Sequence, residues 1–141
     1  MNSNSTPYGI AGYVAGQEQK LEGAMAKRAV AFINPMALGT VGAGTLLAAL
    51  LAPGNLIQRT GPTVAFTDTT DTAANIIAAY PEIDLGVTWE VAYANEVAFA
   101  ATFAAGAGVT LTGLATNAGS GASNRLFVTK TSATTVSIQV A

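Results

Sequence analysis

The sequence predicts a mainly β protein: a small antiparallel β-sandwich or open barrel with one short helix, preceded by a long extended N-terminal arm. From Gly61 onward, short Thr- and Val-rich runs are separated by Gly, Asn and Ser, which is typical of strands joined by turns. One segment of this region has its apolar residues at helical spacing. Upstream of Gly61, residues 1–28 are polar and Gly-rich, and residues 29–58 carry no charge. We therefore expect an arm over residues 1–60 and a compact β domain over residues 61–141.

The arm is expected to hold one short apolar helix near residues 45–52. Its four leucines fall on one helical face, and Pro53-Gly54 would end the helix. The first residues do not resemble a secretory signal, because nothing basic precedes an apolar stretch there.

A membrane helix over Met36–Ala52 is an alternative for the uncharged stretch. The segment lacks charge, but its length lies at the lower limit of a membrane span. Glycines and threonines dilute its hydrophobicity, and Asn34-Pro35 and Pro53-Gly54 bracket it closely. A short helix buried against protein explains the pattern at least as well.

The compact domain is expected to open with a strand at Thr63–Thr67 and a helix that Pro81 stops. Helical spacing joins Ala73 to Tyr80, and Thr70 or Asp71 would cap the helix. Five further strands are expected, at Val87–Tyr93, Val97–Ala104, Val109–Leu114, Asn124–Lys130 and Thr134–Val140.

The connections between these strands are also predictable. Residues 105–108 and Thr131–Ala133 are candidate hairpin turns. Residues 115–123 are small and polar, which is typical of a mobile loop tip.

Composition excludes several classes of function. The chain has 141 residues, a formal charge of -2 and only six Lys and Arg, which argues against a nucleic-acid binder. It has neither Cys nor His, so thiolate sites and the commonest general base and metal ligand are missing. We therefore expect no enzymatic activity, no cofactor and no metal site.

The acidic side chains offer no defensible catalytic or metal constellation. Asp68 and Asp71 are expected near the helix N-terminus, where negative charge is favourable, and their spacing is too sparse for calcium. We expect the carboxylates to be solvated surface groups: Glu18, Glu22, Asp68, Asp71, Glu82, Asp84, Glu90 and Glu96. Trp89 lies on the apolar face of its strand and is expected in the core.

The runs GPTVAFTDTTDTAANIIAAYP, VTWEVAYANEVAFAATFAAGAGVTLTG and RLFVTKTSATTVSIQV resemble tailed-phage virion proteins, more specifically a capsid decoration (cement) protein. The resemblance covers the chain from Gly61 onward and rests on the character of the strands. It implies a homotrimer on the outer surface of an icosahedral virion, assembled in the host cytoplasm. Such a protein binds the major capsid protein and reinforces the shell without catalysis, cofactor or nucleic acid.

In that family an N-terminal arm often ties neighbouring subunits together. Here residues 1–55 would fill that role, and the candidate capsid or subunit contacts are Tyr8, Ile10, Tyr13, Leu46, Leu47, Leu50 and Leu51. The alternatives are a phage fibre or glycan-binding appendage domain, with Trp89 and the loop 115–123 as contact surface, and a small membrane-anchored protein.

Overall fold

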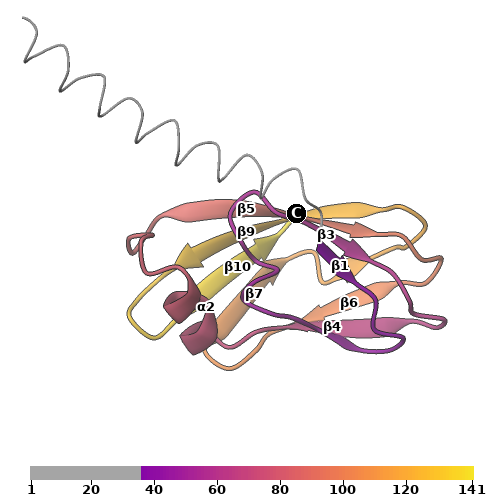
Figure 1. Cartoon of the computed structure of the whole chain (residues 1–141), viewed down its shortest axis with the longest axis horizontal. Coiled ribbons are helices and arrows are strands. Elements are labelled where there is room, and N and C mark those ends of the chain that lie inside the picture. Colours follow the sequence, from indigo (N-terminus) through magenta and orange to yellow (C-terminus); the bar gives the residue numbers. More distant parts are fainter. Residues whose placement is uncertain (1–35) are drawn as a thin grey trace, which may run out of the picture. The chain divides into compact units, whose positions relative to one another are not determined.

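The computed structural model describes residues 36–141, which form two β-sheets and one short helix (Figure 1). The six-stranded sheet has the order β1-β3-β5-β9-β10-β7, and the four-stranded sheet has the order β2-β4-β6-β8. In chain order the elements are β1 (Met36–Leu38), β2 (Gly44–Leu46), β3 (Leu56–Arg59), β4 (Phe66–Thr70), α2 (Ala73–Ala79), β5 (Thr88–Asn95), β6 (Ala101–Ala104), β7 (Val109–Gly113), β8 (Thr116–Asn117), β9 (Ser123–Lys130) and β10 (Val136–Val140). The predicted mainly β, sandwich-like fold with a short helix is confirmed.

The first six strands alternate between the sheets, so that the chain crosses from one layer to the other after every strand. Strands β1, β3 and β5 consequently stack in parallel in the larger sheet, and β2, β4 and β6 stack in parallel in the smaller one. The expectation of antiparallel pairing is therefore wrong for five of the eight strand pairs. Alternating hydrophobicity decides which side chains face the core, but it does not fix the direction of the neighbouring strand.

The core lies between the sheets and is built from alternate residues of the strands. In β5 the side chains of Trp89, Val91 and Tyr93 are buried while Thr88 and Glu90 are exposed, as the alternation predicts. The Trp89 indole N–H donates to the Leu51 carbonyl at 2.8 Å, which satisfies its polar atom.

The domain starts earlier than the sequence predicts. The compact unit covers Asn34–Ala141, and residues 36–59 supply β1, β2 and β3 to the two sheets. The expected boundary at residue 60 is therefore wrong. The strands β1 and β2 have only three residues each, so they are too short to show the alternation by which strands are recognised.

The apolar helix expected near residues 45–52 is a single turn. The Leu50 and Leu51 N–H groups donate to the Leu47 carbonyl at 2.8 and 3.3 Å, but the turn does not continue. The Asp71 carboxylate accepts the Ala48 N–H at 2.8 Å and fixes the start of this turn. A helical face would bury all four leucines, whereas the turn buries Leu46, Leu50 and Leu51 and leaves Leu47 exposed, and leucine spacing alone does not distinguish the two.

Smaller corrections concern the caps and turns. The N-cap of α2 is Thr72, whose hydroxyl accepts the Asn75 N–H, rather than Thr70 or Asp71. The connection 105–108 joins different sheets, so it is no hairpin turn. The turn after Lys130 does join the antiparallel strands β9 and β10, as predicted.

Candidate functional site

Three stacked loops form one end of the sandwich, which we call the arch end. They are residues 39–43 between β1 and β2, residues 60–65 between β3 and β4, and residues 96–100 between β5 and β6. Backbone hydrogen bonds link neighbouring loops: Thr60 N–H donates to the Leu38 carbonyl, and Glu96 N–H donates to the Arg59 carbonyl, both at 3.0 Å. The helix α2 lies at the opposite end (Figure 1).

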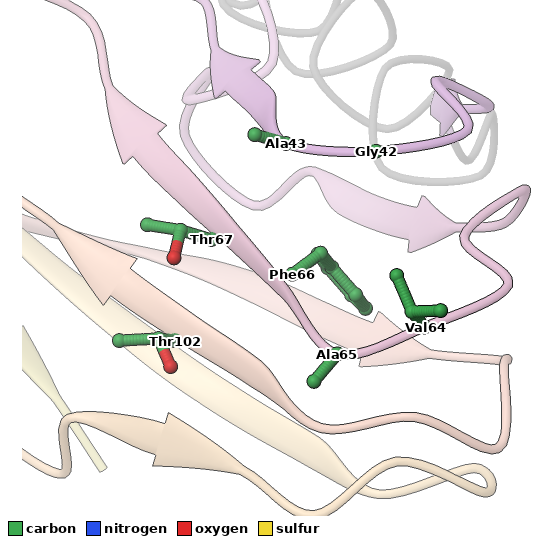
Figure 2. Close-up of a pocket in the computed structure, with 7 residues that line it drawn as sticks. All are labelled: Gly42, Ala43, Val64, Ala65, Phe66, Thr67 and Thr102. Atoms are coloured by element: carbon green, nitrogen blue, oxygen red, sulfur yellow. The ribbon is translucent and has the colours of Figure 1, made fainter.

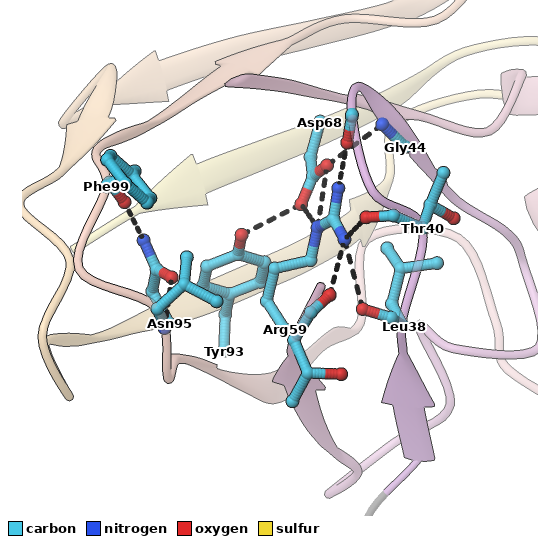
Figure 3. Close-up of polar contacts among 11 residues, drawn as sticks. Leu38, Thr40, Gly44, Arg59, Asp68, Tyr93, Asn95 and Phe99 are labelled. Atoms are coloured by element: carbon cyan, nitrogen blue, oxygen red, sulfur yellow. Dashed lines mark hydrogen bonds and ion pairs between the residues drawn. The ribbon is translucent and has the colours of Figure 1, made fainter. Parts of the chain in front are cut away.

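A buried ion pair holds the first loop in place (Figure 3). Arg59 ends β3 and Asp68 lies in β4, and both side chains are fully buried. The Arg59 Nε lies 2.8 Å from Asp68 Oδ2, and this oxygen also accepts the Tyr93 hydroxyl at 2.8 Å. Burial, and next the Asp68 charge, raise the pKa of Tyr93 above its ordinary value, so the phenol stays a proton donor.

The rest of the Arg59 guanidinium binds loop backbone. Its Nη1 donates to the carbonyls of Leu38, Thr40 and Thr60 at 3.1, 2.6 and 3.0 Å, and its Nη2 donates to the Gly42 carbonyl. One cation therefore fixes the first loop along its length. Within the turn itself, the Thr40 and Gly42 carbonyls accept hydrogen bonds from the guanidinium, which meets the need of buried backbone groups for a partner.

Two glycines allow this close packing. A Cβ on Gly44 would come within 2.8 Å of Asp68 Oδ1, the oxygen that accepts the Gly44 N–H at 3.1 Å. Gly61 has a φ of 102°, and a Cβ there would lie 2.3 Å from the Gly39 carbonyl oxygen. Both positions need glycine because backbone or a buried carboxylate occupies the space of a side chain.

The third loop is held by an amide instead of an ion pair. Asn95 is fully buried at the end of β5, in register with Arg59. Its side-chain N–H donates to the Phe99 carbonyl at 2.8 Å, and its oxygen accepts the Val97 N–H at 3.2 Å (Figure 3). The buried side chains of Arg59, Asp68 and Asn95 thus hold the loops of the arch end in place through hydrogen bonds.

The outer surface of the arch end exposes large apolar side chains. Each loop exposes one large apolar side chain: Val41 is 65% exposed, Val64 is 62% exposed and Phe99 is 40% exposed. A shallow hollow of about 400 Å³ lies beside the first two loops (Figure 2). Its lining carries no charge and consists of Gly42, Ala43, Val64, Ala65, Phe66, Thr67 and Thr102. Such a surface, held in shape from below and carrying Glu96 as the one charged side chain of its three loops, is suited to contact with another protein.

Polar anchors also hold the opposite end. Asp71 accepts the N–H groups of Ala48 and Thr72 and the Asn75 side-chain amide, at 2.7 to 2.8 Å. Burial opposes ionisation of Asp71, but these hydrogen bonds together outweigh it and hold its pKa below the ordinary value of 3.8. Lys130 Nζ donates to the Tyr80 and Ile83 carbonyls just after α2, where a cation meets the negative end of the helix dipole.

The predicted contact residues meet different outcomes. Leu46 and Leu51 are fully buried and Leu50 is 7% exposed, so these three are core residues, and the prediction that they contact a partner is wrong. Only Leu47 of the four leucines is exposed, at 53%. An uncharged, leucine-rich segment is equally typical of a protein core and of an interface. Only the position of each leucine in the folded chain shows which of the two it belongs to. Tyr8, Ile10 and Tyr13 lie outside the described residues.

The carboxylates were expected at the surface, and two of them are not there. Asp68 is fully buried and Asp71 is 9% exposed. The sequence contained one indication that Asp68 is buried, namely Arg59, the single charge within the otherwise uncharged residues 29–67. A lone cation beside apolar strands needs a buried anionic partner. No group of three or more acidic side chains within residues 36–141 is arranged to hold a metal ion.

The contact surfaces that the glycan-binding and membrane alternatives need can be compared with the fold. Trp89 is 7% exposed, as expected for a core residue, and so it offers no stacking platform. The loop 115–123 contains β8, and Asn117 within it is buried and bonded to Asn124. Among the described residues, no helix has both the length and the hydrophobicity that crossing a membrane requires.

Comparison of the chain with protein-family models, curated proteins and solved structures gives no match. The function must therefore be argued from the arrangement of the residues. That arrangement is a β scaffold whose buried charged side chains all have polar partners, and whose arch end presents apolar side chains above the Arg59–Asp68 pair.

Proposed function

We propose that the protein is a structural virion protein that binds the outside of an icosahedral phage capsid and reinforces it by linking major capsid protein subunits. The observation that carries the proposal is the arch end, where three stacked loops each present one apolar side chain above a network of buried hydrogen bonds. A surface fixed in advance loses little conformational entropy on binding, which favours a permanent structural contact.

The arch end carries one acidic residue, Glu96, and has the buried Arg59–Asp68 pair beneath it. A charge-poor surface binds by shape and apolar contact, and salt has little effect on such binding. This suits attachment to a shell. It does not suit recognition of nucleic acid, whose affinity depends on phosphate contacts and therefore on salt.

The proposal assigns Tyr8, Ile10 and Tyr13 to a preceding segment that contacts neighbouring subunits. Of the leucines, Leu47 alone stays in the proposed contact set, because the others belong to the core. It precedes Ala48, which Asp71 binds at the end opposite the arch end, so the proposal assigns it to contact with a neighbouring subunit and not with the shell. The protein would act as a homotrimer on the outer surface of the virion and would assemble in the host cytoplasm. It would need no cofactor.

Co-sedimentation with heads built from the chain's own major capsid protein tests the proposal. Val64→Asp places a charge on the arch end, and Leu85→Asp places one at the opposite end on a side chain of similar exposure, 59% against 62%. We expect Val64→Asp to abolish sedimentation with heads and Leu85→Asp to leave it unchanged. Binding that both variants retain, or that only Leu85→Asp loses, would contradict the assignment of the arch end.

The same experiment separates the fibre or appendage alternative. A protein of that class would associate with tails or with host cells, and not with tail-free heads. Recovery of the wild-type chain with tails alone would therefore replace the capsid hypothesis.

A further inference from the structure

The two edges of the larger sheet are unpaired within the described residues. The strand β1 pairs only with β3, and β7 pairs only with β10. Each edge strand thus presents a row of backbone N–H and C=O groups that could accept another strand. Such edges normally carry protection against pairing between molecules, above all charged side chains.

Neither edge strand carries a charged side chain. Residues 29–58, which include β1, have no charge, and neither do residues 97–124, which include β7. The charges of this sheet lie on strands that are paired on both sides: Arg59 on β3, Glu90 on β5, and Arg125 and Lys130 on β9. The distribution is the reverse of the usual protective one.

The directions of the strands also match. The chain of pairings from β1 through β3, β5, β9 and β10 contains two antiparallel steps, so β1 and β7 run in the same direction. A rotation about an axis parallel to the strands preserves strand direction. It can therefore bring the β7 edge of one copy beside the β1 edge of the next.

We propose that copies of this chain associate head to tail, with β1 of one copy pairing in parallel with β7 of the next. The larger sheet then continues from copy to copy. The contact uses two different surfaces, so it forms a ring or a longer series rather than a symmetric dimer. This inference concerns the isolated protein and stands whether or not the chain binds a capsid.

Cysteine crosslinking of the full chain tests the proposal, because the chain has no cysteine of its own. Ala37 on β1 and Thr110 and Thr112 on β7 are exposed, and their inward neighbours Leu38 and Leu111 pack on the core. Ala37→Cys is co-expressed with Thr110→Cys or with Thr112→Cys, which covers two registers. We expect a disulfide between chains in at least one co-expressed pair, and none when each variant is expressed alone.

A chain carrying both cysteines then gives a ladder of linked copies, whose highest member counts the copies in the assembly. Crosslinking of Ala37→Cys alone would show symmetric pairing of β1 edges and would overturn the proposal. So would a wild-type chain that light scattering finds monomeric, or the absence of any disulfide in the mixed pairs.

Charge substitution provides a second readout that does not depend on register. Thr112→Lys places a charge on the β7 edge, and Gln139→Lys places one on β10, in the same row of the sheet but on a strand paired on both sides. We expect Thr112→Lys to shift the protein to the monomer mass and Gln139→Lys to keep the assembled mass. Equal behaviour of the two variants would contradict an edge contact.

Discussion

Removal of the Asp68 carboxylate should destabilise the protein severely. The substitution Asp68→Ala leaves the Arg59 guanidinium fully buried without an anion, and it takes away the acceptor of the Tyr93 hydroxyl and the Gly44 N–H. Breaking a buried ion pair on one side costs about 3–5 kcal/mol. A domain of this size has a free energy of unfolding of about 5–15 kcal/mol, so the variant should approach the limit of folding.

Urea denaturation followed by the fluorescence of Trp89, the single and buried tryptophan, measures this loss. The control is Glu90→Ala, which removes an exposed pair with an N–O distance of 3.9 Å to Arg125 and should cost no more than about 1 kcal/mol. A cost below about 1 kcal/mol for Asp68→Ala would refute the structural role of the pair.

A double variant sharpens the test. Arg59→Met with Asp68→Leu removes both charges, so it should be more stable than Asp68→Ala. It should remain less stable than the wild type, because Arg59 also satisfies loop carbonyls, including those of Thr40 and Gly42. A double variant no more stable than Asp68→Ala would show that the unpaired charge is not the cause.

Three further predictions concern other parts of the domain. The pKa of Asp71 is lowered in the folded state, so its hydrogen bonds stabilise the fold fully above the ordinary carboxyl pKa of 3.8. This contribution to stability is lost as the pH falls through the lower folded value. The substitution Asp71→Asn should therefore reduce the pH dependence of stability measured by urea titration in acid. Burial, and next the Glu82 charge, raise the pKa of Tyr80 from 10.0 to about 12. The contribution of the protonated phenol to folding stability is therefore complete below pH 10 and disappears as the pH rises through about 12. The phenolate absorbance that Tyr80→Phe removes should titrate near the higher value. Gly106→Ala should cost more than about 2 kcal/mol, because its Cβ would lie 2.4 Å from two backbone oxygens, whereas Gly42→Ala, with open space at its Cβ, should change the melting temperature little.

Most strands after Gly61 were predictable because they are long enough for alternation to show. The exceptions are the two-residue strand β8, which lies in the segment expected to be a loop, and β6, which begins at Ala101 and not at Val97. The strand β5, with Trp89, Val91 and Tyr93 inward, is the clearest case, and the helix from Ala73 follows from its apolar spacing. Strand order and direction were not predictable, since they depend on contacts between residues far apart in the chain. The parallel stacking of β1, β3 and β5 has no local sequence signal.

The candidate site was only partly predictable. The leucines of residues 46–51 were recognised as an apolar face, but the sequence could not tell that a turn buries three of them inside the same chain. The arch end was not predicted, because its exposed Val41, Val64 and Phe99 are far apart in sequence and meet only through stacked loops. The clue that the sequence offered to the buried ion pair beneath these loops was the presence of Arg59 and Asp68, nine residues apart in a region with few charges.

Photocrosslinking from the arch end shows whether this surface binds the shell. One full-length chain carries a photoreactive residue in place of Val64, and a second carries it in place of the equally exposed Leu85 at the opposite end. Both are bound to heads and irradiated. The proposal predicts a covalent adduct with the major capsid protein from position 64 and none from position 85. An adduct from position 85 alone, or from neither position, would contradict it.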